Sequence, residues 1–220
     1  MNVLVSTVPR SGSTLLFNMC RLLFEKAYGK EKIYSNWYQF YKTNDEKEYN
    51  IKKIHDRVQK DVQWSDKIVT TVRDIRYIMA SYYDFNKKFD INNKEKLKNA
   101  CKGFIEMMES NIPISSYVFK YEDFFSDKAK VISELASALE IAKNKININF
   151  VIDEIEKIKT AKYLKLDKNL TQMHPNHISP KTSEDIKNRL TKEQLSFIEE
   201  NCSCFLRKHN YKLISSIKIL

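Results

Sequence analysis

Apolar runs alternate with amphipathic stretches through the first two thirds of this 220-residue chain. Runs of strand length occur at residues 3–5, 51–55, 68–72 and 116–121. Apolar residues recur at helical spacing from residue 15 to a stop at Gly29, from 74 to 85, and from 128 onward after an Asp127 N-cap. This alternation of strands and helices predicts an α/β fold with a central parallel β-sheet flanked by helices.

The C-terminal third is predicted to be mostly helical. One helix is expected over residues 150–158, and Thr191 with Gln194 forms a capping box ahead of another. Residues 29–50 and 165–184 show weak periodicity and are expected to form long loops, which often carry function in α/β domains.

The length and composition fit one ordinary globular domain or at most two small ones, because 42% hydrophobic residues in 220 are enough to form a core and exclude a disordered chain. Glycine is scarce: the chain has three, whereas average usage of roughly 7% predicts about fifteen. Collagen-like, glycine-linker and propeller architectures are therefore excluded.

A net charge of +10 is compatible with an anionic partner. The basic residues are mainly lysines spread over nearly every polar segment, a pattern more typical of a solvated surface than of a nucleic-acid footprint. We expect no nucleic-acid partner, although a basic nucleic-acid-binding module remains an alternative.

The cysteines indicate a reducing compartment. They lie in apolar helical stretches without CxxC spacing, so we expect buried thiols and no zinc site at Cys20, Cys101, Cys202 and Cys204. No apolar run approaches 18 residues, and the apolar residues 1–7 are too few for a signal peptide. The expectation is a cytoplasmic protein without a membrane partner.

The most informative segment is Ser-Thr-Val-Pro-Arg-Ser-Gly-Ser-Thr at residues 6–14, between the first strand and the first helix. Such a loop directs backbone N–H groups and hydroxyls at an anion, and Arg10 adds a planar fork suited to phosphate oxygens. It is not a Walker A loop, which would need Lys in place of Ser13. Considered by itself, the segment predicts either an anion site or a structural turn.

Four motifs together carry a family resemblance. Residues 9–14 resemble the 5′-phosphosulfate loop of sulfotransferases that use 3′-phosphoadenosine 5′-phosphosulfate (PAPS), and Arg at position 10 is most similar to the carbohydrate and tyrosylprotein branches. Lys53-Ile54-His55 resembles the family's Lys-x-His, residues 72–83 its 3′-phosphate motif, and Tyr121-Glu122-Asp123 its Tyr-Glu-Asp. The motifs occur in the family's order.

The resemblance implies a P-loop-containing nucleoside triphosphate hydrolase-like sulfotransferase fold in one domain over residues 1–220. Residues 1–139 would form the cofactor-binding and catalytic core, and residues 140–220 a mostly helical remainder. It further implies that the product is 3′,5′-adenosine bisphosphate (PAP) and that no metal is needed.

The resemblance also assigns cofactor-binding roles. The 5′-phosphosulfate would be held by Arg10, Ser11, Gly12, Ser13 and Thr14. Arg73 and Ser81 would hold the 3′-phosphate, and Ser179 and Lys181 would add to them. Tyr121 would approach the adenine, although a core aromatic at a strand end is the alternative interpretation.

For catalysis we expect His55 to act as the general base, since sulfuryl transfer removes a proton from the acceptor and an imidazole suits this near neutral pH. A structural histidine is the alternative. Lys53, two residues earlier on the same strand face, would stabilise charge on the leaving nucleotide's bridging oxygen.

The acceptor is expected to present a hydroxyl or an amine, and Trp37, Tyr38 and Tyr82 are candidates for its pocket. A small satellite core is the other interpretation of Trp37 and Tyr38, and the chain's aromatics also have a core to fill. Either a monomer or a homodimer is compatible with the sequence. The alternative enzyme is a P-loop-type small-molecule kinase that uses ATP and magnesium, with Asp74 as the magnesium-binding acid.

Overall fold

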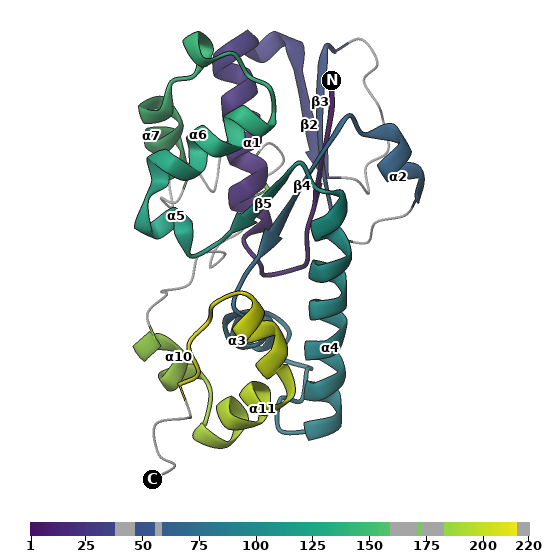
Figure 1. The fold of residues 1–220 in the computed structure, drawn as a ribbon, viewed down its shortest axis with the longest axis vertical. Helices are drawn as coiled ribbons and strands as arrows, with labels where there is room; N and C mark the ends of the chain where they lie inside the picture. The colour runs from purple at the N-terminus through teal and green to yellow at the C-terminus, as the bar shows by residue number, and fades with distance from the viewer. Residues whose placement is uncertain (38–46, 56–58, 159–170, 173–182, 215–220) are drawn as a thin grey trace. The chain divides into compact units, whose positions relative to one another are not determined.

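The structure is a computed structural model, and we describe its residues 1–37, 47–55, 59–158, 171–172 and 183–214. These residues group into two compact units. The first contains residues 1–72 and the part of the chain from 110 to 172, and the second contains residues 73–109 and 183–214. Figure 1 shows the course of the chain through both.

The first unit is built on a five-stranded parallel sheet with the order β2-β3-β1-β4-β5. Its strands are β1 (Asn2–Ser6), β2 (Ile33–Trp37), β3 (Tyr49–Ile54), β4 (Lys67–Val72) and β5 (Tyr117–Lys120). This confirms the predicted α/β class and four of the strands. The prediction of a loop throughout residues 29–50 is wrong over β2 and the start of β3. The edge strand β2 is only half-buried, and its pairing with β3 defines it more than its own sequence does.

Helices cover both faces of this sheet (Figure 1). α1 (Ser13–Tyr28) packs against β1 to β4 and against α6 (Lys128–Ala138) and α7 (Ile148–Ile158), while α2 (Gln59–Trp64) packs against β1. Val3 and Val5 join the large core beneath α1, whereas Leu4 joins a smaller cluster with Val62 and Trp64 of α2. Alternating side chains of β1, the central strand, are therefore buried on both faces of the sheet.

The capping signals of this unit are present. Gly29 ends α1 at φ 96°, and the Asp127 side chain accepts from the N–H of Lys130 at 2.9 Å to begin α6. The short α5 (Asp123–Ser126) and the 3-10 turns at Lys30–Lys32, Ile112–Ile114 and Lys143–Lys145 complete the described part of the unit.

The second unit is helical. It contains α3 (Ile75–Phe85), α10 (Ser183–Arg189), α11 (Lys192–Lys208) and all but the last two residues of α4 (Lys94–Asn111). α3 packs against α10 and α11, and the predicted capping box of Thr191 and Gln194 begins α11. α4 was not predicted from the sequence, because its many charged residues obscure the apolar stripe of Leu97, Cys101 and Met108.

Candidate active site

The loop that joins β1 to α1 lies at the topological switch point of the sheet. β1 has β3 on one side and β4 on the other, and the chain leaves β1 toward β2 but leaves β4 toward β5. In open parallel sheets, ligands bind outside the carboxyl ends of the strands at this point. Because all five strands are parallel, the residues of the first unit that follow β1, β3 and β5 lie at the same end of the sheet.

The backbone of this loop takes two left-handed turns, at Arg10 (φ 65°) and Gly12 (φ 99°). Ser11 lies between them and is fully buried. Its Oγ donates to the carbonyl of Val8 at 2.7 Å and contacts Oγ1 of Thr71 in β4. The Ser11 hydroxyl therefore anchors the loop to the sheet. The N–H groups of the first turn of α1, beginning at Ser13, have no carbonyl partner within the helix and are directed at the loop.

Gly12 is the point at which the loop contacts Tyr121, the residue that follows β5. A Cβ on Gly12 would lie 2.8 Å from Cε2 of Tyr121 and closer still to Cδ2. The Tyr121 N–H donates to the carbonyl of Val72 at 2.9 Å, which holds the backbone of Tyr121 at the end of β4. Two predicted site residues are thus in direct contact, and only glycine fits between helix and ring.

Lys53 extends from β3 to the first turn of α1. Its Nζ donates to Oγ1 of Thr14 at 3.0 Å and lies 5.8 Å from the centre of the Phe17 ring. The side chain is buried, and this burial lowers the pKa of Lys53 to about 7. The structure therefore brings together Lys53 and the β1–α1 loop.

His55 lies directly after β3 and is half-buried. Its Nδ1 donates to the carbonyl of Thr7 at 2.8 Å, while the N–H of Thr7 donates to the carbonyl of Ile54 at 3.2 Å. Because a carbonyl oxygen only accepts, Nδ1 carries the proton of the neutral ring and Nε2 carries the lone pair. The end of β1 thus fixes the tautomer that a general base acting through Nε2 needs.

Three predicted site residues belong to the second unit. Arg73 and Ser81 are both buried, before and within α3, and the Arg73 guanidinium lies 5.8 Å from the Tyr77 ring. Tyr82 packs edge to face against Phe89 and Phe104, with ring centres 5.2 Å apart in each case. Tyr82 therefore takes part in an aromatic cluster of the second unit.

Of the other predicted site residues, only Trp37 lies within the described part of the chain. Trp37 ends β2 and is paired in register with Lys53. Tyr38, Ser179 and Lys181 lie outside the described residues.

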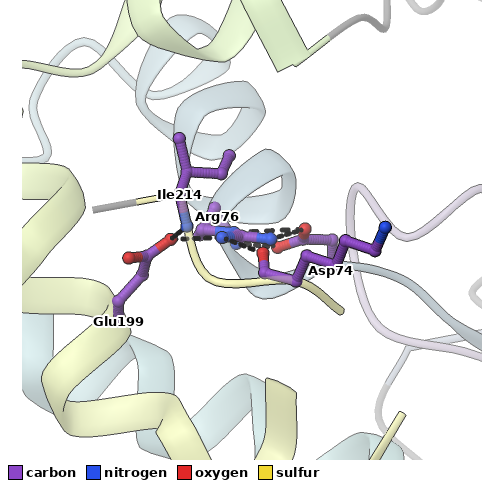
Figure 2. A network of polar contacts seen from close by, with 5 residues as sticks. Asp74, Arg76, Glu199 and Ile214 are labelled. Carbon is purple, nitrogen blue, oxygen red and sulfur yellow. Dashed lines mark hydrogen bonds and ion pairs between the residues drawn. The ribbon is translucent and has the colours of Figure 1, made fainter. Parts of the chain in front are cut away.

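Two buried polar networks were not identified from the sequence. On α1, Asn18 Nδ2 donates to the carbonyls of Thr14 (2.8 Å) and Thr171 (2.7 Å), and its Oδ1 accepts from Arg21. On α3, the Asp74 carboxylate caps the helix and pairs with Arg76, which also pairs with Glu199 of α11 (Figure 2). The signal was present as Asn18 and Arg21 inside an apolar helical stretch, but it does not identify the partners.

These contacts also bear on the alternatives. The carboxylate that the kinase hypothesis takes as a magnesium ligand is the one engaged by Arg76. Within the described part of the chain, no three His, Cys, Asp or Glu side chains are grouped so that they could hold a metal ion. In the same residues, no helix is long and apolar enough to cross a bilayer.

Three of the four cysteines, Cys20, Cys101 and Cys202, are buried as predicted. The prediction is wrong for Cys204, which is exposed. Cys204 follows Cys202 by two residues on α11, and two residues turn a helix by about 200°, so the two thiols lie on opposite faces.

Comparisons with known proteins identify the family and the fold. The model of the family described as "Sulfotransferase domain" matches residues 1–213. A comparison of the sequence with curated proteins finds no match.

Solved structures with a similar fold include retinol dehydratase in complex with androsterone and the inactive cofactor PAP, at 13% identity and a TM-score of 0.57 over 99% of this chain and 82% of that one. Retinol dehydratase with retinol and PAP is 14% identical, with a TM-score of 0.57 over 100% and 83%. Mouse sulfotransferase SULT7A1 with PAP is 14% identical, with a TM-score of 0.56 over 94% and 84%. The predicted sulfotransferase fold is therefore confirmed.

Proposed function

Because the chain belongs to the sulfotransferase domain family, we propose that it transfers the sulfuryl group of PAPS to a hydroxyl or amine of an acceptor and releases PAP. The observation that carries this proposal is the convergence of the β1–α1 loop with Lys53 and His55 at one edge of the sheet. The similar solved structures that hold PAP give it further support.

The β1–α1 loop fits a phosphosulfate group. The two left-handed residues Arg10 and Gly12 bend the loop around the start of α1, whose first N–H groups favour an anion, and Tyr121 packs against Gly12 where a Cβ would otherwise lie. We assign the 5′-phosphosulfate to Arg10 and the main chain and side chains of residues 11–14, with the Ser11 hydroxyl holding the loop in shape.

In the transfer step, the acceptor oxygen or nitrogen forms a bond to sulfur while the bond from sulfur to the bridging oxygen breaks. Nε2 of His55 accepts the acceptor proton, and the electron pair of the broken bond leaves with PAP. Lys53 stabilises the charge on the bridging oxygen from its position beside Thr14. A binding anion favours the protonated form of a lysine whose pKa burial has lowered to about 7.

At the other end of the nucleotide we assign the 3′-phosphate to Arg73 and Ser81, with Ser179 and Lys181 as further ligands, and the adenine to the vicinity of Tyr121. Trp37, Tyr38 and Tyr82 remain proposed acceptor contacts. We also propose that residues 1–220 form one sulfotransferase domain, which is cytoplasmic and acts as a monomer or homodimer. It uses no metal and binds neither nucleic acid nor membrane.

The first test is the His55→Ala variant in a transfer assay with labelled PAPS and a panel of alcohols, phenols and amines. Transfer should fall by about 10²–10⁴-fold, the usual contribution of a general base, while PAP affinity stays within about threefold. His209→Ala is the matched control, because His209 pairs with Glu109 on the second unit. Transfer at the wild-type rate by the His55 variant would refute the assignment.

The second test is Arg73→Ala, measured by calorimetry with PAP and with adenosine 5′-phosphate (AMP). The variant should lose about tenfold or more in PAP affinity and little in AMP affinity, since hydrogen bonds to charged groups contribute about 1.5–3 kcal/mol. Equal losses for both nucleotides would contradict the 3′-phosphate role.

The kinase and nucleic-acid alternatives are separated by thermal shift. Stabilisation by PAP without magnesium supports the sulfotransferase, because a ligand that binds only the folded state raises its stability. Stabilisation by ATP only with magnesium, or by an oligonucleotide only, would favour one of the other two.

A further inference from the structure

The start of α3 is held by a buried network of charges that belongs entirely to the second unit (Figure 2). Arg76 Nε donates to both oxygens of the Asp74 carboxylate, at 2.9 and 3.1 Å, and a terminal nitrogen donates to Oδ2 at 2.6 Å. The other terminal nitrogen donates to Oε1 of Glu199 and, at 3.0 Å, to the carbonyl of Lys212. Glu199 Oε1 also accepts from the N–H of Ile214 at 2.7 Å.

Burying these charged side chains costs desolvation free energy, and removing one of them is therefore destabilising. Asp74, Arg76 and Glu199 are each at most 3% exposed. Burial by itself lowers the pKa of Arg76, but the hydrogen bonds and charges of Asp74 and Glu199 outweigh it and raise that pKa. Without Arg76, two buried carboxylates would face each other with no guanidinium between them.

The network acts on the residues to which we assign the 3′-phosphate. Asp74 directly follows Arg73, and its Oδ1 accepts from the N–H of Arg76, so the same carboxylate caps α3 and pairs with the guanidinium. The cap fixes the residue at which α3 begins, and therefore the helical phase of Ser81, two turns later.

We propose that Arg76 is a positioning residue for the 3′-phosphate of the nucleotide. It holds the start of α3 so that Arg73 and Ser81 can contact the same phosphate group. It also neutralises the Asp74 carboxylate, which would otherwise repel this anion. The segment Lys212–Ile214 also belongs to the network, because the Lys212 carbonyl accepts from Arg76 and the Ile214 N–H donates to Glu199. This inference rests on the proposed function.

The experiment compares PAP with AMP, which lacks the 3′-phosphate, by calorimetry on the full chain. The readout is the ratio of the AMP and PAP dissociation constants. In Arg76→Gln this ratio should fall at least tenfold from the wild-type value, whereas a purely structural role would lower both affinities together. In the double variant Asp74→Asn/Arg76→Gln the ratio should recover to within about threefold of wild type, because Asn is a good N-cap and brings no repulsive charge.

Arg189→Gln is the matched control. Arg189 pairs with Asp84 near the other end of α3, with Nε 3.0 Å from Oδ2, so this variant removes an arginine–carboxylate pair from the same helix without touching the network. Its ratio should equal the wild-type ratio. If Arg76→Gln does not fold, Arg76→Lys carries the same comparison, because Lys keeps the charge but loses the planar fork, and its ratio should fall at least threefold.

An unchanged ratio in the folded Arg76 variants would overturn the positioning role while leaving the proposed function intact. A wild-type chain that binds PAP no better than AMP would refute the assigned 3′-phosphate site and this inference with it. A fall in the ratio without recovery in the double variant would refute the charge argument.

Discussion

Gly12→Ala tests how much the contact between the β1–α1 loop and Tyr121 contributes to the stability of this part of the fold. An alanine at φ 99° meets the left-handed penalty of about 1–2 kcal/mol. Its Cβ would also lie 2.8 Å from Cε2 of Tyr121, whose ring is buried and packs against Phe119 and Phe125. Overpacking of this kind costs about 1–3 kcal/mol, so we expect a total loss of roughly 2–5 kcal/mol.

The assay is urea unfolding of four chains: wild type, Gly12→Ala, Tyr121→Ala and the double variant. With the ring removed, Gly12→Ala should cost only its conformational penalty of about 1–2 kcal/mol, and the coupling energy isolates the steric part. Gly103→Ala is the matched control, because Gly103 lies exposed within α4 with nothing within 4 Å of a new Cβ. Its free energy of unfolding should rise by about 0.5–1 kcal/mol, because alanine favours a helix interior over glycine.

An equal cost of Gly12→Ala with and without the Tyr121 ring would refute the steric argument. A cost below about 0.5 kcal/mol, the range of ordinary surface substitutions, would refute the backbone argument as well.

Two further predictions concern buried polar groups of the first unit. Burial lowers the pKa of Lys53 to about 7, so between pH 7 and about 10 the unfolded chain holds a proton that the folded chain has released, and stability rises with pH by up to about 4 kcal/mol. Urea titrations should show that Lys53→Met loses this rise; identical pH profiles would contradict it. Asn18→Ala leaves the Arg21 donors and the Thr14 and Thr171 carbonyls without this partner, and its urea midpoint should report a loss of about 2–3 kcal/mol. Thr191→Ala, at an exposed capping box, should cost about 1 kcal/mol, and an equal loss in both would refute the buried-network argument.

Local signals in the sequence account for most of the site in the first unit. The loop at residues 9–14 follows a buried strand and begins a helix, and Lys53 and His55 stand at the end of another strand. In a parallel sheet these ends meet at one edge, so chain order and strand prediction together suffice to bring the residues close. The capping residues Asp127 and Thr191 were predictable for the same reason, since a cap acts within three residues.

Signals that depend on distant partners were not accessible in this way. β2 becomes a strand through its pairing with β3, and Asn18 finds Thr171 at a separation of 153 residues. Arg76 and Glu199 are 123 residues apart, and no local pattern marks them as partners.

The sequence by itself determined the alternation of strands and helices, the position of the β1–α1 loop and the family motifs, because each depends on neighbouring residues and on the periodicity of helix or strand. Only the tertiary structure decided that the Tyr121 ring fills the space beside Gly12, that the Thr7 carbonyl sets the tautomer of His55, and that Arg76 joins α3 to α11. These are contacts between segments far apart in the chain, and their geometry arises only when the packed core brings the strand ends and helices together.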